Sequence, residues 1–143
     1  MTAKQYLRQV YRLNELIDSD LKELDQLRDL ASSVSSSNLS GMPHSPNRDA
    51  EPSFVRCLPK IINLENKIID EIDKYVDLKE EIRSKIEQIP DKNERLILQN
   101  RYLLFHTWEV IAEELNFTTQ WVHEIHKRAL QDFSKNLIPN FLL

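Results

Sequence analysis

Apolar residues recur at alternating spacings of three and four along residues 2–34, as they do on one face of a long helix. The main seam of this face contains six apolar positions: Leu7, Val10, Ile17, Leu21, Leu24 and Ala31. Asn14 and Arg28 occupy the same seam and interrupt it. A second set of apolar residues widens the stripe: Leu13, Leu16, Leu27, Leu30 and Val34. The pattern predicts one long amphipathic helix of the coiled-coil kind.

The same spacing returns after residue 53 and continues to Ile89. Its seam contains seven apolar or aromatic positions and two charged ones: Ile61, Glu65, Ile68, Ile72, Tyr75, Lys79, Ile82, Ile86 and Ile89. Pro59 suits the first turn of a helix and disturbs a helix interior, so regular helix is expected to begin near Pro59. Pro90 ends this second helix.

Residues 32–53 connect the two helices and differ from both in composition. They contain eight Ser and three Pro and show no periodicity, which is typical of a flexible loop. Residues 1–90 are therefore predicted to form a long antiparallel helical hairpin. In such a hairpin, paired positions have a constant sum of residue numbers, which places Arg28 beside Glu65 and Asn14 beside Lys79. Surplus apolar residues occur on both helices, among them Leu13, Leu16, Leu27, Leu30, Ile62, Ile69 and Val76. They must be covered by the C-terminal domain, by the apolar tail or by another protomer, and we expect a homodimer through the long helices.

Residues 91–143 are predicted to form three more helices and an apolar tail, "LIPNFLL", that docks against them. Asp91 and Glu94 have the spacing of a capping box at the start of the first of these helices. Thr107 and Thr118 are placed to cap the next two, the last of which runs from Thr119 to about residue 136. No alternation typical of a strand occurs in the chain, so the predicted fold class is all-α.

The stretch from residue 107 to 130 has the local features of a helix-turn-helix. Asn116 stands where the chain must leave the first helix in a left-handed conformation, which Asn tolerates better than most residues. Phe117 is expected to fill the core from inside the turn, and Thr118 to cap the second helix. The faces expected to pack together are apolar: Ile111, Ala112 and Leu115 on the first helix, and Val122, Ile125, Ala129 and Phe133 on the second.

The sequence "TWEVIAEELNFTTQWVHEIHKRAL" at these positions resembles region 4 of bacterial sigma factors, and "LILQNRY" upstream resembles the helix that precedes it in that region. With the "SGMPHS" stretch and "LENKI", nearly the whole chain resembles short sigma-region-4-like proteins of phages and prophages in Gram-positive bacteria. The resemblance implies a three-helix sigma-region-4-like domain at residues 91–143. It also implies a transcription regulator that binds double-stranded DNA and acts with host RNA polymerase.

The resemblance also implies which residues contact DNA: Thr118, Thr119, Gln120, Trp121, His123, Glu124, Lys127 and Arg128. Sigma region 4 typically has Arg at the positions of Thr119 and His123, so this chain brings less charge to the bases and phosphates. Residues 91–143 contain six Lys or Arg and seven Asp or Glu. Binding by one protomer is therefore expected to be weak, and a dimer would strengthen it by linking two reading helices.

Other classes of function find little support in the composition. The chain has a net charge of -4, one Gly and one Cys, so Gly-rich phosphate loops and thiolate metal cages are not expected. His123 and His126 lack a third metal ligand, and no nucleophile–base arrangement is visible, so we expect no enzyme, no metal and no cofactor. The charged N-terminus and the absence of a long apolar run predict a cytoplasmic protein outside the membrane.

Two other functions remain open from the sequence. The first alternative is a protein-interaction module that binds RNA polymerase or another regulator without contacting DNA. The second is a structural protein that only oligomerises.

Overall fold

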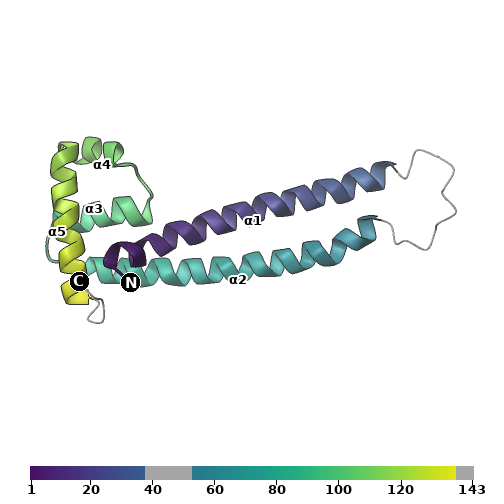
Figure 1. Ribbon diagram of the computed structural model, residues 1–143, viewed down its shortest axis with the longest axis horizontal. Helices are drawn as coiled ribbons and strands as arrows, with labels where there is room; N and C mark the ends of the chain where they lie inside the picture. The colour runs from purple at the N-terminus through teal and green to yellow at the C-terminus, as the bar shows by residue number, and fades with distance from the viewer. Residues whose placement is uncertain (38–52, 138–143) are drawn as a thin grey trace. The chain divides into compact units, whose positions relative to one another are not determined.

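The computed structural model describes residues 1–37 and 53–137, which contain helices and no strand (Figure 1). The elements in order are α1 (Ala3–Ser37), α2 (Ser53–Glu87), α3 (Lys92–Leu98), the π-helical turn η1 (Gln99–Leu103), α4 (Trp108–Leu115) and α5 (Thr119–Leu137). The predicted all-helical class is thus confirmed for this part of the chain. The apolar tail beyond Leu137 and most of the predicted Ser-rich loop lie outside the described residues.

The second long helix starts earlier than the sequence predicts. α2 begins at Ser53, so Pro59 lies inside the helix and not in its first turn. Pro cannot donate a backbone hydrogen bond, which weakens the helix at this point. The preceding turn is nevertheless anchored, because Cys57 is buried in a cluster with Ala31 and Ile61. Packing between α1 and α2 therefore overrides the local preference of the proline.

The described residues fall into two compact units. One, here called the hairpin unit, consists of Glu15–Asp73, and the other, the terminal unit, consists of Met1–Asn14 together with Lys74–Leu143. The boundary between the two units therefore lies within α1 and within α2. The sequence, in contrast, predicts a boundary at Pro90. The reason is that the beginning of α1 and the end of α2 share a core with the C-terminal helices. Whether residues 91–143 fold alone stays a prediction.

The hairpin unit is held together by an apolar seam between antiparallel stretches of α1 and α2 (Figure 1). Its buried cluster consists of Leu24, Ala31, Cys57, Ile61 and Ile68. Arg28 Nη2 lies 3.1 Å from Glu65 Oε1, which confirms the pairing predicted from the constant sum. The side chains of Arg28 and Glu65 are 54% and 41% exposed, so this ion pair lies at the rim of the seam. An ion pair at such exposure contributes little stability.

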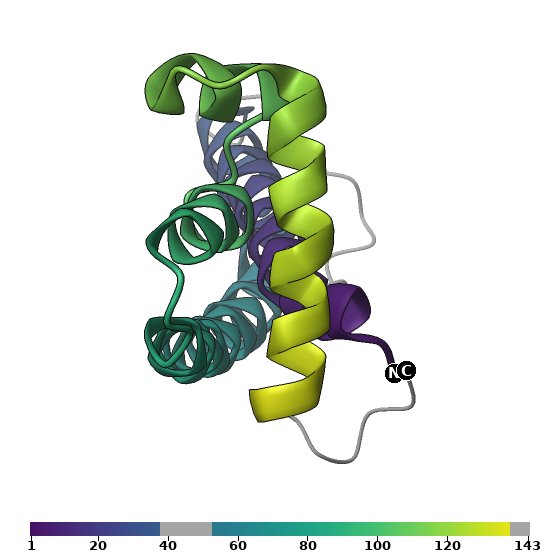
Figure 2. The same cartoon turned by 90° about the vertical axis from the view of Figure 1, so that its left-hand side faces the viewer.

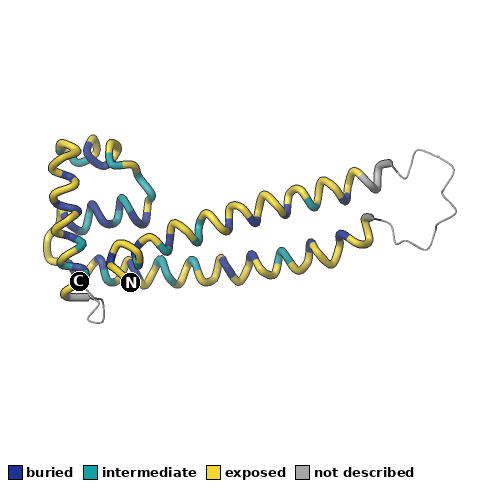
Figure 3. The backbone as a smooth tube through the Cα atoms, viewed as in Figure 1, coloured by how far each residue is buried: buried dark blue, intermediate teal, exposed yellow. Residues whose placement is uncertain are grey.

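One layer of the hairpin unit differs from the predicted seam. Leu21 and Ile72 are exposed, and their neighbours Asp20 and Glu71 are buried in their place. An α-helix turns once per 3.6 residues, so a face defined by a 3.5-residue repeat drifts around each helix over several turns. Lys67 Nζ lies 3.5 Å from Asp20 Oδ2 and 3.8 Å from Glu71 Oε1, and its charge partly compensates the two buried carboxylates. The blue positions along both helices in Figure 3 trace the resulting seam.

The terminal unit has a larger core, to which four helices and η1 contribute. Its buried residues are Ala3, Leu7, Val10, Ile82, Ile86, Ile89, Leu98, Tyr102, Leu103, Ala129 and Phe133. Figure 2 shows α5 passing in front of the ends of the other helices, with α4 at its upper end. Because Ala129 and Phe133 are fully buried, the C-terminal half of α5 is fixed against the beginning of α1 and the end of α2.

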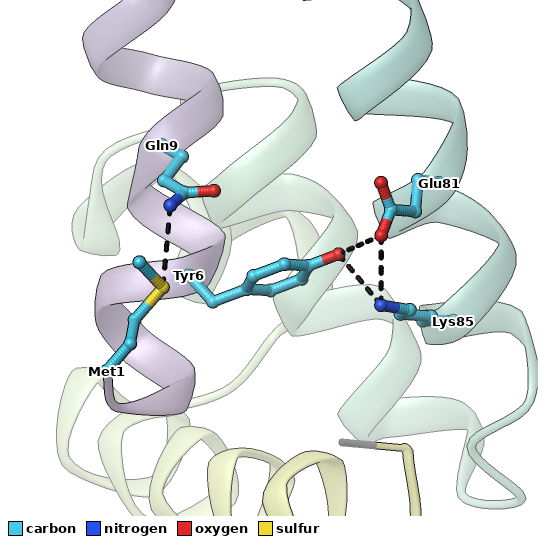
Figure 4. A network of polar contacts seen from close by, with 5 residues as sticks. All are labelled: Met1, Tyr6, Gln9, Glu81 and Lys85. Atoms are coloured by element: carbon cyan, nitrogen blue, oxygen red, sulfur yellow. Dashed lines mark hydrogen bonds and ion pairs between the residues drawn. The ribbon is translucent and has the colours of Figure 1, made fainter. Parts of the chain in front are cut away.

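A polar network joins α1 to α2 within the terminal unit (Figure 4). The Tyr6 hydroxyl donates to Glu81 Oε1 at 2.7 Å, and Lys85 Nζ donates to the same hydroxyl at 2.9 Å and to Glu81 at 3.1 Å. The hydrogen bond from Tyr6, followed by that from Lys85, lowers the pKa of Glu81 below its ordinary value. The network fixes the first turns of α1.

The second predicted polar pair of the hairpin does not form. Lys79 Nζ lies 3.4 Å from the Tyr75 hydroxyl and 5.7 Å from the centre of the Phe105 ring, and no hydrogen bond joins Lys79 to Asn14 in the described residues. Phe105 reaches Lys79 from the connection between η1 and α4. The sequence-based pairing considered α1 and α2 alone and could not include this third partner.

Candidate nucleic-acid interface

The turn between α4 and α5 has the geometry predicted from the sequence. Thr107 Oγ1 accepts a hydrogen bond from the backbone N–H of Val110 at 3.3 Å and caps α4. Asn116 is left-handed, with φ 56° and ψ 40°, and ends that helix. Thr118 Oγ1 then accepts from the backbone N–H of Trp121 at 3.1 Å and caps α5. These three residues stop one helix and start the next within a few positions.

The inner faces of α4 and α5 pack together with α3. This cluster contains Ile97, Ile111, Ala112, Val122 and Ile125, with Trp108, Leu115 and Phe117 partly buried against it. The apolar faces predicted for the two helices are therefore confirmed. Because Val122 and Ile125 face inward, residues on the opposite side of α5 are directed to solvent.

All eight residues predicted to contact DNA are exposed: Thr118, Thr119, Gln120, Trp121, His123, Glu124, Lys127 and Arg128. Gln120, His123 and Lys127 are three and four residues apart and so share one face of α5. Trp121 lies to one side of this face, and its side chain is accessible to a partner because the residue is 41% exposed. Arg128 lies with its guanidinium carbon 5.2 Å from the centre of the Trp121 ring. The pair presents a cation and an indole together on the surface of α5.

His123 is also connected to the helices behind it, through Trp108. The rings of Trp108 and His123 have centroids 4.6 Å apart, and the Arg101 guanidinium carbon lies 4.4 Å from the centre of the Trp108 ring. Trp108 is half-buried between these side chains. This stack links Arg101 on η1 to the exposed face of α5. This stack was not predicted from the sequence, because the spacing between residues 101, 108 and 123 follows no simple period.

His126 has a different environment from His123 although both are on α5. It is buried, and its Nε2 lies 2.7 Å from the Tyr102 hydroxyl. Burial, then the nearby charges of Lys4, His123 and Arg101, lowers the pKa of His126 to about 4. The imidazole is therefore neutral near pH 7 and serves to hold α5 against η1. Two His at a three-residue spacing thus have separate surroundings here.

Glu94 on α3 faces α5 and is also buried. Burial, followed by the hydrogen bond and charge of Asp132 and the charge of Asp91, raises the pKa of Glu94 to about 7, while Arg128 opposes the shift. Glu94 Oε2 is buried without a hydrogen-bond partner among the described residues, and protonation of Glu94 removes the charge that burial and the nearby carboxylates disfavour. The α3–α5 contact thus depends on protonation.

The π-helical turn η1 carries Arg101 and Tyr102, and it is followed by Phe105 at a positive φ of 59°. Asn100 stabilises this connection, because its Nδ2 donates to the Leu96 carbonyl at 2.7 Å and its Oδ1 lies 3.0 Å from His106 Nδ1. π-Helical turns and left-handed non-glycine residues are frequent at functional sites. Neither feature follows from a periodic pattern or a motif in the sequence.

Within the described ranges, no three His, Cys, Asp or Glu side chains come together as metal ligands. None of the helices there has an apolar stretch of the length that a bilayer crossing requires. Comparison of the chain with protein-family models, with curated proteins and with solved structures finds no match. The geometry and charge of the exposed face of α5 therefore carry the functional argument.

Proposed function

We propose that this protein is a sequence-specific DNA-binding transcription regulator of phage or prophage type, acting with host RNA polymerase. In this proposal α3 with η1, α4 and α5 form a sigma-region-4-like helix-turn-helix, and α5 enters the major groove. The observation that carries the proposal is the division of α5 into two faces. Gln120, His123 and Lys127 are exposed, while Val122 and Ile125 on the other side are buried.

The chemistry of the exposed face suits DNA. Gln120 lies in the first turn of α5, the part of a recognition helix that contacts base edges. Its amide can both donate to and accept from adenine, which contributes roughly 1–3 kcal/mol of discrimination. Lys127 and Arg128 lie further along the helix and are suited to phosphates, which set affinity and orientation more than sequence.

Two substitutions on α5 separate these roles. Gln120→Ala is expected to reduce the preference for the specific site over unrelated DNA, with roughly 1–3 kcal/mol lost from the difference. Lys127→Ala is expected to weaken binding to all sequences and to reduce the slope of log affinity against log salt by about 1. The measurement is fluorescence anisotropy with duplexes from DNA surrounding its own gene and with scrambled duplexes, over a range of salt concentrations. Lys74→Ala, at an exposed lysine on α2, is the control.

The same variants test the alternative function, a module that grips a protein. If that alternative holds, any DNA binding is the same for wild type, Gln120→Ala and Lys127→Ala. Capture of RNA polymerase then falls in the two variants and not in Lys74→Ala. This result would replace the DNA-binding proposal.

We further propose that the protein forms a homodimer through the outer face of α2. In the hairpin unit, five of the large apolar residues that α2 leaves exposed follow spacings of three, four, seven and three: Val55, Leu58, Ile62, Ile69 and Ile72. Ile62 and Ile69 are 55% and 56% exposed, and burying such side chains contributes about 1.5–3 kcal/mol each. A heptad stripe of this kind is suited to a helix of a second copy.

Sedimentation tests the dimer. The wild-type protein is expected to sediment with the mass of a dimer at tens of micromolar, and the double variant Ile62→Glu/Ile69→Glu as a monomer. Asn63→Glu introduces a charge at an exposed polar position on another face of the same helix and should leave the dimer intact. A wild-type protein that sediments as a monomer would disprove the proposal.

A further inference from the structure

A pocket of about 260 Å³ lies in the terminal unit, between the beginning of α1 and the turn η1. It is lined by two arginines, three aromatic residues and one threonine: Arg8, Arg101, Tyr11, Tyr102, Phe105 and Thr107. Arg8 also lines a second hollow, of about 420 Å³, that continues along α1 to Arg12. Neither pocket contains a carboxylate among its lining residues, so both favour an anion.

The cations on this part of α1 lack acidic partners. Lys4, Arg8 and Arg12 are four residues apart and therefore project from one face of the helix. All three are exposed, and none of them forms an ion pair or hydrogen bond with the described residues. Some cations elsewhere are paired, for example Lys67 with Asp20 and Lys85 with Glu81. An unpaired row of positive charge is costly to assemble and is typical of a surface that binds phosphate.

The cations beside the pocket add positive charge to the unit that is proposed to bind DNA. Residues 91–143 have one more acidic than basic residue, a weak starting point for a DNA-binding domain. Residues 1–14 contain three cations and no Asp or Glu, and they belong to the same compact unit. The fold therefore brings a concentrated positive charge to the helices that the sequence alone leaves slightly negative.

Arg101 connects the pocket to the exposed face of α5. Its guanidinium lies against one ring of the Trp108–His123 stack, and its Nη1 donates to the His106 carbonyl at 3.0 Å. Thr107, at the rim of the pocket, is the N-cap of α4, so the positive end of this helix also opens there. Lys4 lies close enough to His126 to help lower its pKa, which places Lys4 near α5.

The first turns of α1 are held in place, as a binding surface requires. Tyr6 lies between Lys4 and Arg8 in the sequence but points to Glu81 and Lys85 of α2 (Figure 4). Leu7 and Val10 are fully buried in the core of the terminal unit. With these residues directed inward, the three cations lie on a neighbouring face of α1 that is exposed.

We propose that the pocket of Arg8 and Arg101, extended along α1 by Lys4 and Arg12, binds phosphates of the DNA backbone next to the groove that α5 reads. The inference rests on the proposed DNA-binding function. Eight residues of helix separate Lys4 from Arg12, a length of about 12 Å. Successive phosphates of one strand rise about 3.4 Å along the duplex axis, so the row can follow about three phosphates. Arg8 and Arg101 present planar, multiply donating groups that suit phosphate oxygens.

The test compares DNA binding by the full chain and by variants of α1. Arg8→Gln/Arg12→Gln is expected to lower affinity for both specific and scrambled 30-base-pair duplexes by at least about tenfold, and to reduce the salt slope by about 2. Arg8→Lys/Arg12→Lys keeps the charge and is expected to retain most of the slope. Lys74→Gln removes an exposed charge from α2 and should change neither quantity. Thermal unfolding of each variant should match the wild type, because the replaced side chains have no partners to lose.

The outcomes separate the two proposals. If wild type and Arg8→Gln/Arg12→Gln bind DNA alike while Lys127→Ala weakens binding, the phosphate pocket is disproved and the α5 proposal stands. If the double variant loses binding while Gln120→Ala and Lys127→Ala do not, the pocket binds DNA and α5 does not read it. A wild-type protein that binds neither duplex at low salt overturns both.

Discussion

Val122→Asp is expected to unfold the helices around α5 and, through that loss, to abolish DNA binding of any kind. Val122 is fully buried in the cluster formed by Ile97, Ile111 and Ile125. A carboxylate at this position has no cation to pair with in the cluster. Either the charge stays buried without a partner, or α5 must move away from the cluster. The expected cost is roughly 4 kcal/mol or more, a large part of the total stability of a small domain.

The control for Val122→Asp introduces the same side chain on the opposite face of α5. Gln120 is exposed and lies in the first turn, where a negative charge interacts favourably with the helix dipole. Gln120→Asp should therefore change the urea midpoint little, while Val122→Asp should lower it strongly or remove the transition. Circular dichroism during urea unfolding measures both. Equal midpoints for the two variants would show that α5 is not packed as described.

The second large effect concerns pH, because two buried groups on neighbouring helices titrate in opposite senses. Burial and nearby cations lower the pKa of His126 to about 4, whereas an unfolded His titrates near 6.5. As the pH falls from about 6.5 to 4, the unfolded chain binds a proton at His126 and the folded chain does not. Stability from neutral His126 is therefore lost between about pH 6.5 and 4, by up to about 3 kcal/mol.

The contribution of Glu94 to stability depends on pH in the opposite sense to that of His126. Burial and the neighbouring Asp132 raise its pKa to about 7, so the folded protein keeps a proton that the unfolded chain releases above pH 4.5. The contribution of Glu94 is complete below pH 4.5 and is lost as pH rises to about 7. Between pH 4.5 and 6.5, the stability contributed by His126 rises with pH and that contributed by Glu94 falls with pH. The two changes partly cancel, so the free energy of unfolding of the wild-type protein is expected to vary little over this range.

Glu94→Gln is expected to remove the contribution of Glu94, so that the pH dependence of stability due to His126 becomes measurable. The amide cannot ionise and can still donate to Asp132, so the loss of stability above pH 4.5 disappears. The variant should be more stable than wild type at pH 8 by at least about 1 kcal/mol, and its stability should fall steeply below pH 6.5. Urea unfolding across pH 4 to 8 gives the profiles. Glu113→Gln, at an exposed carboxylate on α4, should follow the wild type. A Glu94→Gln profile parallel to wild type would rule out this account of the α3–α5 contact.

Local signals in the sequence were sufficient for much of this fold. The caps at Thr107 and Thr118 and the left-handed Asn116 depend on neighbouring residues alone, and all were predicted. The buried faces of α4 and α5 follow from helical period, and the Arg28–Glu65 pair from antiparallel geometry. These features need no knowledge of distant parts of the chain.

Features that depend on a third element were missed. Asn14 does not pair with Lys79, because Phe105 and Tyr75 surround the lysine. Asp20 replaces Leu21 in the seam, since small drifts in helix phase decide which of two neighbours is buried. The pocket of Arg8 and Arg101 joins residues far apart in the sequence, so neither period nor motif could indicate it.

α5 belongs to two hydrophobic clusters at once. Val122 and Ile125 anchor its first half beside α4, and Ala129 and Phe133 anchor its second half beside α1 and α2. A continuous helix that is packed at both ends is rigid. Binding of a partner to the exposed first turns of α5 is therefore expected to affect its packing against the beginning of α1. Slow-exchanging amide hydrogens at both ends of α5 should therefore gain protection together when a ligand binds at one end.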